Sequence, residues 1–130
     1  MGKPGVVVID ADQQQCHRVV ALLHQFSYRA AALYSLTDME KHMQENPCQV
    51  VILDLDTVPA TNQFFRAFKR KNPDIYILGL SHLPHHPGLE EAMGSHIYAC
   101  LGKPLDPEEL LYWLKSIPEN LANSGGAPRG

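Results

Sequence analysis

The sequence lacks the features of secreted, membrane-spanning and nucleic-acid-binding proteins. Its three cysteines are an odd number without paired spacing, so they indicate reduced, buried thiols in a cytoplasmic protein and not a disulfide framework. No apolar run is long enough to cross a bilayer, and the first residues do not resemble a signal peptide. The net charge of −3 gives no indication of a surface for nucleic acid. The 130 residues, 45% of them apolar, fit one soluble globular domain.

Three apolar runs of the sequence end in charged residues. Val6-Val7-Val8-Ile9 leads into Asp10, Val50-Val51-Ile52-Leu53 leads into Asp54, and residues 97–101 lead through a glycine into Lys103. Runs of this length between turn residues are typical of strands that are buried on both faces. Side chains at the C-terminal ends of such strands meet where an open parallel sheet builds its ligand site. The pattern favours an aspartate that handles phosphate together with a divalent cation.

Strand and helix patterns alternate along the chain. Strands are expected at residues 6–9, 29–34, 49–53, 75–80 and 97–101. Helices are expected at residues 13–26, after a capping box of Thr37 and Glu40, after Thr61 or Asn62, at residues 88–95, and after an N-cap at Asp106. Five such units predict an α/β fold, in which a doubly wound five-stranded parallel sheet lies between two helical layers. The domain is expected to span residues 1–120, followed by a flexible tail or linker at residues 121–130.

The polar residues after these strands form a set suited to phosphoryl transfer. In such a reaction one aspartate attacks in line, and a divalent cation held by further carboxylates neutralises the phosphoryl oxygens. A lysine and a hydroxyl complete the contacts to those oxygens. Asp54, the pair Asp10 and Asp12, Ser81 and Lys103 supply these groups from the ends of four different predicted strands.

On these residues the chain resembles the receiver domain of two-component response regulators, over roughly residues 5–118. The resemblance rests on three motifs and on their order. They are Val50-Val51-Ile52-Leu53-Asp54, Ile77-Leu78-Gly79-Leu80-Ser81 and Cys100-Leu101-Gly102-Lys103-Pro104. It implies a flavodoxin-like, three-layer α/β/α topology. It also implies that Asp54 is the phosphoacceptor, that Ser81 is the switch hydroxyl, and that Lys103 is the ion-pair partner of the phosphoryl group.

The departures from the family pattern concern the metal site and the switch. The resemblance makes Asp10 one of two adjacent acids that hold Mg²⁺, but Ala11 stands at the second position. The loss of a carboxylate weakens the expected magnesium site, because cation affinity depends on the number of charged ligands. Asp54 and Asp56 are the further expected metal ligands, and Asp12 is either another ligand or the N-cap of the first helix. Cys100 replaces the aromatic switch residue of the family.

The main hypothesis is therefore a signalling module without enzymatic turnover. It takes a phosphoryl group on Asp54 from a histidine kinase or phosphotransfer protein and then switches a protein–protein surface. The signal is expected to pass to a downstream protein or to a fused output domain. The switched surface could also join two copies of this chain as a homodimer. Neither nucleic acid nor a membrane is an expected partner of this domain.

Two alternatives remain open. The first is a phosphorylation-independent docking domain, favoured by Ala11 and Cys100, which would bind a partner through Tyr112 and Trp113 of the last helix. The second is a phosphatase, because residues 54–58, Asp-Leu-Asp-Thr-Val, also resemble the nucleophile motif of haloacid-dehalogenase-type enzymes. That family carries the motif on its first strand, whereas here it follows the third.

Overall fold

The computed structural model describes residues 5–117, and five parallel strands form its central sheet. The strands are β1 (Val6–Ile9), β2 (Ala30–Leu33), β3 (Val50–Asp54), β4 (Tyr76–Leu80) and β5 (Ala99–Leu101), in the order β2-β1-β3-β4-β5. The helical segments are α1 (Gln13–Gln25), α2 (Leu36–Glu45), α3 (Asn62–Lys71), the π-helical η1 (Ala92–His96) and α4 (Pro107–Ser116). The predicted doubly wound, flavodoxin-like parallel sheet is confirmed. The expected tail at residues 121–130 lies outside the described residues.

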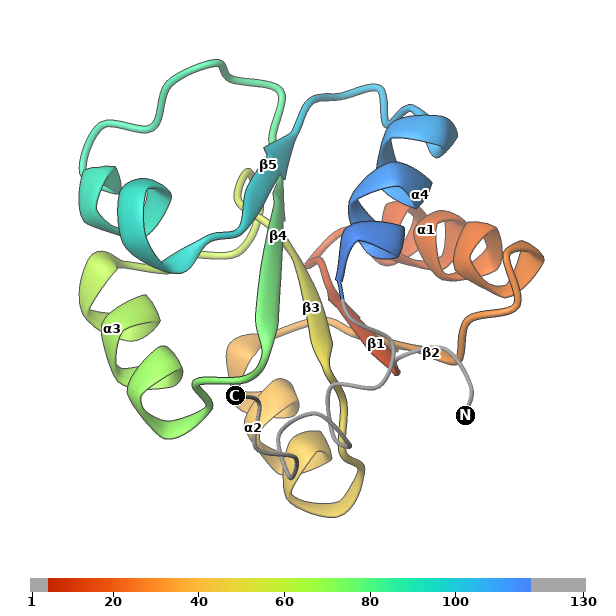
Figure 1. Ribbon diagram of the computed structural model, residues 1–130, viewed down its shortest axis with the longest axis horizontal. Helices are drawn as coiled ribbons and strands as arrows, with labels where there is room; N and C mark the ends of the chain where they lie inside the picture. The colour runs from red at the N-terminus through yellow and green to blue at the C-terminus, as the bar shows by residue number, and fades with distance from the viewer. Residues whose placement is uncertain (1–4, 118–130) are drawn as a thin grey trace, which may run out of the picture.

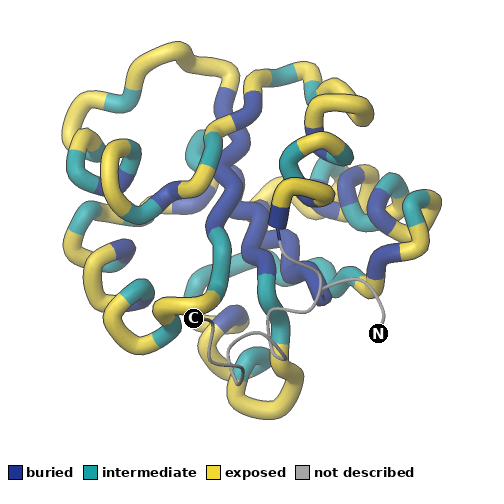
Figure 2. Tube along the Cα trace, in the orientation of Figure 1, coloured by how far each residue is buried: buried dark blue, intermediate teal, exposed yellow. Residues whose placement is uncertain are grey.

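Two hydrophobic cores cover the two faces of the sheet. α1 and α4 lie on one face, and α2, α3 and η1 lie on the other (Figure 1). Because successive side chains of a strand point to opposite faces, Val6 and Val8 of β1 pack toward the first group while Val7 and Ile9 pack toward the second. Figure 2 shows the result, with buried strands inside and exposed residues on the outer faces of the helices. This double burial explains why the strands are continuous apolar runs instead of alternating ones.

The strand order places the C-terminal ends of β1 and β3 at the switch point of the sheet. The chain moves outward from β1 to β2 on one side, and from β3 through β4 to β5 on the other. Ile9 pairs with Leu53 in register, so Asp10 and Asp54 follow neighbouring positions on adjacent strands. In open α/β sheets ligands bind in the crevice outside the carboxyl ends of the strands at such a point.

The helix starts agree with the sequence analysis at two caps and differ at a third. Thr61 and Asp106 cap α3 and α4, each with its side chain accepting a backbone N–H of the first turn. The prediction that Thr37 caps the second helix is wrong. Ser35 is the cap, and its hydroxyl accepts the N–H of Asp38. Ser35 has the extended backbone that an N-cap requires, whereas Thr37 already lies inside the helix.

The helix predicted at residues 88–95 is also wrong in extent. Gly88 has a positive φ of 90°, which ends the preceding loop in a conformation that no helix continues. Glu90 and Glu91 are α-helical and continue into the π-helical η1. The segment is held from outside by the side-chain amide of Asn62 in α3. That amide donates to the carbonyl of Gly88 and accepts from the N–H of Ala92. Tertiary contacts, and not helical propensity, therefore shape this segment.

The cysteines are less uniformly buried than predicted. Cys16 is buried and Cys48 half-buried, but Cys100 is exposed, and all three are free thiols. Burial raises the pKa of the Cys16 thiol, and likewise that of the Cys48 thiol, to about 11. Within residues 5–117, no helix combines the length and apolar character needed to cross a membrane.

Candidate functional site

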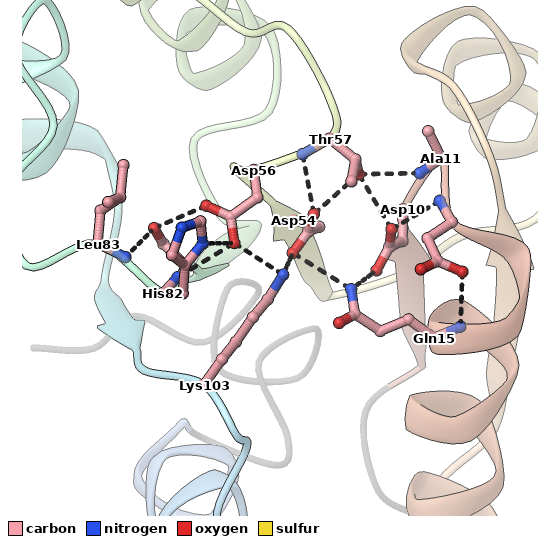
Figure 3. A network of polar contacts seen from close by, with 11 residues as sticks. Asp10, Ala11, Gln15, Asp54, Asp56, Thr57, His82, Leu83 and Lys103 are labelled. Carbon is pink, nitrogen blue, oxygen red and sulfur yellow. Dashed lines mark hydrogen bonds and ion pairs between the residues drawn. The ribbon is translucent and has the colours of Figure 1, made fainter.

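Asp54 lies at the centre of a polar network at the C-terminal end of β3 (Figure 3). Its carboxylate has no exposed surface. Lys103 Nζ, from the loop after β5, lies 2.5 Å from Asp54 Oδ1. The other oxygen, Oδ2, accepts the backbone N–H of Thr57 at 2.9 Å and its hydroxyl at 2.8 Å. Both oxygens of this buried anion therefore have donors, as a charge in such an environment requires.

Asp10 forms the second buried carboxylate, beside Asp54. The hydroxyl of Thr57 lies 3.0 Å from Asp10 Oδ1, and the amide nitrogen of Gln15 in α1 contacts Oδ2. The same Gln15 nitrogen lies 3.4 Å from Asp54 Oδ1. Thr57 and Gln15 thus each join the two carboxylates. The Thr57 hydroxyl carries one proton, so it can donate to only one of them at a time.

Sequence reasoning missed Thr57 and Gln15. Thr57 had one usable signal, because a residue three places after an aspartate can donate its N–H to that carboxylate in a local turn. Gln15 had none. Gln15 reaches Asp10 from the first turn of α1 because the helix packs against the sheet. The spacing of residues in the sequence does not predict this contact.

Asp12 and Ala11 lie beside this centre without adding a carboxylate to it. Asp12 caps α1, and its Oδ1 accepts the backbone N–H groups of Gln14 at 3.1 Å and of Gln15 at 3.2 Å. Its own N–H donates to Asp10 Oδ1 at 2.9 Å. The N–H of Ala11 donates to the Thr57 hydroxyl at 3.1 Å. The capping role that the sequence left open for Asp12 is the one its side chain has.

Asp56 turns away from Asp10 and toward the ends of β4 and β5. Its Oδ1 accepts the Ser81 hydroxyl at 3.0 Å, and its Oδ2 lies 2.8 Å from Lys103 Nζ. The backbone N–H of His82 and the imidazole Nδ1 of the same residue lie 3.1 and 2.8 Å from Oδ2. Lys103 therefore links the Asp54 half of the network to the Asp56 half, as Figure 3 shows.

The donor set around Asp54 suits a hard divalent cation. Mg²⁺ takes oxygen ligands and is commonly held by one or two carboxylates with several waters. Asp10 and Asp54 are two adjacent, buried carboxylates, and the Thr57 hydroxyl adds a third oxygen. Within residues 5–117, His, Cys, Asp and Glu side chains form no cluster of three or more that could hold a metal. Of the four predicted ligands, Asp10 and Asp54 are the two whose carboxylates share a contact, the hydroxyl of Thr57.

The charges of the network are strongly coupled. Burial by itself would lower the pKa of Lys103, but its hydrogen bonds to Asp54 and Asp56 raise that pKa above its ordinary value. Burial would likewise raise the pKa of Asp56, but the hydrogen bonds from Lys103 and His82 outweigh it and hold that pKa well below its usual range. The ammonium is shared, so neither carboxylate has a cation of its own.

We expect acid to destabilise the wild-type domain more than an Asp56→Asn variant. The lowered pKa of Asp56 in the folded state means that its stabilising contribution is present above the unfolded pKa, about 3.9, and is lost as the pH falls below that value. Urea unfolding at about pH 6 and about pH 3 measures the difference. An equal loss of unfolding free energy in both proteins would contradict the assignment.

The comparisons with known proteins agree with this fold. The family model of the response regulator receiver domain matches residues 6–115. No curated protein sequence matches the chain. The signal receiver domain of an HD domain-containing protein from Pseudomonas fluorescens Pf-5 superposes with a TM-score of 0.82 at 18% identity, covering 98% of this chain and 96% of that one. The chemotaxis response regulator CheY4 of Vibrio cholerae superposes with a TM-score of 0.75 at 20% identity, covering 90% of this chain and 100% of that one.

A third solved structure shares the same fold. The beryllofluoride-activated NtrC4 receiver domain dimer has a TM-score of 0.77 at 22% identity and covers 90% of this chain and 98% of that one. At such identities these structures report the fold alone. The family model is the stronger finding, since its match includes every strand of the sheet and all but the last residue of α4. The chain therefore belongs to the response regulator receiver domain family.

Proposed function

We propose that this domain accepts a phosphoryl group on Asp54 from the phosphohistidine of a histidine kinase or phosphotransfer protein. The observation that supports it best is the position of Asp54. Its carboxylate lies at the switch point of the sheet, with Lys103 Nζ at 2.5 Å and the second buried carboxylate, Asp10, alongside. A phosphoryl acceptor needs an in-line carboxylate and positive charge at the phosphoryl oxygens, and this arrangement supplies both.

Phosphoryl transfer to Asp54 forms one bond and breaks one bond. An Asp54 oxygen attacks phosphorus, the new P–O bond forms as the P–N bond of the phosphohistidine breaks, and the electron pair of that bond stays on the donor imidazole. Lys103 then neutralises the transferred group. A bound Mg²⁺ would neutralise further negative charge, with Asp10 and Asp54 as its ligands from the protein.

A second candidate function is docking that does not depend on phosphate. It is favoured by the aromatic side chains of α4 and of Tyr98, which directly precedes β5. Tyr112 is 65% exposed and stacks edge-on against Trp113, which stacks in the same way against Tyr98. Exposed Tyr and Trp side chains are frequent anchors of protein interfaces. A downstream protein, a fused output domain or a second copy of this chain would be the partner, and the NtrC4 structure is an example of a receiver dimer.

An NMR titration of amide shifts distinguishes the two functions. Mg²⁺ followed by beryllofluoride, an analogue of the phosphoryl group, is expected to shift the amides of Asp54, Ser81 and Lys103 in the wild type and to leave Asp54→Asn unchanged. Asp12→Asn is the matched control and should respond like the wild type, because Asp12 caps α1. No response of the wild type to either ion at millimolar concentration would reject the phosphoacceptor and leave the docking function.

A further inference from the structure

The carboxylate of Asp56 occupies a site built for an oxyanion. Its donors come from the ends of two strands. The Ser81 hydroxyl and the His82 backbone N–H follow β4, and the Lys103 ammonium follows β5, at 3.0, 3.1 and 2.8 Å. The hydroxyl donates to Oδ1, and the backbone N–H and the ammonium reach Oδ2. Such donors around the two oxygens of one carboxylate form an anion-binding arrangement whatever the anion is.

The donors are held in place independently of the anion. Ser81 is 2% exposed, and its oxygen accepts the N–H of Leu83 at 3.0 Å, which directs its single proton toward Asp56. The His82 N–H belongs to the backbone. The Lys103 side chain is 18% exposed and is anchored by Asp54 at 2.5 Å. Removal of the Asp56 carboxylate would therefore leave these three donors, with the His82 imidazole beside them, around an empty space.

Lys103 also relates this site to the phosphoacceptor. Its Nζ lies 2.5 Å from Asp54 Oδ1 and 2.8 Å from Asp56 Oδ2, so it bridges the two carboxylates. An anionic group carried by Asp54 would lie within reach of the same ammonium. Two anions cannot both keep the full attraction of one cation, and like charges at this range repel each other.

We propose that Asp56 is a built-in stand-in for the phosphoryl group, which holds Ser81, His82 and Lys103 in the unphosphorylated domain and must be displaced when Asp54 carries phosphate. The displacement rests on the proposed function of Asp54, whereas the occupation of the anion site by Asp56 does not. One consequence is that Ser81 and the loop after it are ordered without phosphate. The other is that Asp56 opposes phosphorylation as an internal competitor.

Chemical rescue tests the occupied site by itself. In Asp56→Ala, formate alone is expected to bind with saturation and to return the amide shifts of Ser81, His82 and Leu83 toward their wild-type values. The wild type should show no saturable response to formate, because its site is filled. The double variant Asp54→Asn/Asp56→Ala also loses the carboxylate that anchors Lys103. It should still bind formate, because the Ser81 hydroxyl, the His82 N–H and the ammonium charge remain. Failure of both Asp56→Ala proteins to bind formate, with their fold intact by NMR, would overturn the proposal.

Competition tests the displacement. Asp56→Asn preserves the size of the side chain but removes its charge, which guards against a variant that fails to fold. In the presence of Mg²⁺, beryllofluoride is expected to bind Asp56→Asn at least about tenfold more tightly than the wild type, the effect of releasing one charge-assisted hydrogen bond. Equal affinities would overturn the competitor role. If neither protein binds beryllofluoride while formate rescue succeeds, the phosphoacceptor function fails and the anion site stands.

Discussion

Replacement of Lys103 by methionine is expected to destabilise the domain by about 3–5 kcal/mol, the range for removing one partner of a buried ion pair. Methionine retains the length of the side chain but leaves Asp54, which has no exposed surface, without the ammonium at 2.5 Å. It also removes a donor to Asp56. Urea unfolding at neutral pH measures the loss. A loss near zero would mean that the ion pair is not formed in solution.

A second substitution separates lost attraction from lost packing. Adding Asp54→Asn to Lys103→Met removes the buried charge that lacks its partner, so the double variant should be more stable than Lys103→Met alone. The coupling free energy of this cycle is expected to be about 1–3 kcal/mol, within the range for directly contacting residues. Strictly additive effects would show that methionine acts through packing and that Asp54 does not sense the ammonium.

The other large effect is expected in the core beneath α3. Phe65→Ala should lower the free energy of unfolding by about 3–5 kcal/mol, because a fully buried aromatic ring leaves a cavity that the structure fills only in part. Against a total stability of about 5–15 kcal/mol, that loss would unfold a substantial fraction of the protein on mild heating. Urea and thermal unfolding give the measurement.

The neighbouring ring provides the matched control. Phe64 stacks edge-on against Phe65 with ring centroids 5.2 Å apart, but it is only half-buried. Phe64→Ala should therefore cost clearly less than Phe65→Ala, although the two residues are adjacent and of the same type. Equal losses would contradict the assignment of Phe65 to the core.

The polar network at the strand ends has two halves, one around Asp54 and one around Asp56. Asp10, Thr57 and Gln15 surround Asp54 on the side of β1, where a cation would be held. Asp56 and Ser81 form the other half on the side of β4, where Ser81 and Lys103 hold the Asp56 carboxylate. Lys103 contacts both halves, so a change of charge in one is transmitted to the other through a single ammonium. Asp56 therefore does not replace the carboxylate that is missing at Ala11, because it contacts Ser81 and Lys103 on the side of β4.

Composition and hydrophobic pattern were sufficient to predict the strands and the sheet, which depend on the burial of apolar side chains. The apolar run before Asp54 predicted a strand buried on both faces, and the alternation of five such units predicted the parallel sheet. Since the carboxyl ends of parallel strands share one edge, the meeting of Asp10, Asp54, Ser81 and Lys103 followed from the order of elements alone. These inferences succeed because side-chain periodicity and hydrophobicity are properties of the chain itself.

Tertiary structure decided which way each polar side chain turns. Asp12 and Asp56 follow strands just as Asp10 and Asp54 do, yet one caps α1 and the other binds Ser81 and Lys103. The positions of Gln15 and Thr57, and the later start of the helix predicted at residues 88–95, were decided in the same way. The sequence by itself therefore determined the fold and the edge of the sheet where the site lies. The partner of each carboxylate was set only by packing, because a hydrogen bond depends on distances of about 3 Å between segments far apart in the chain.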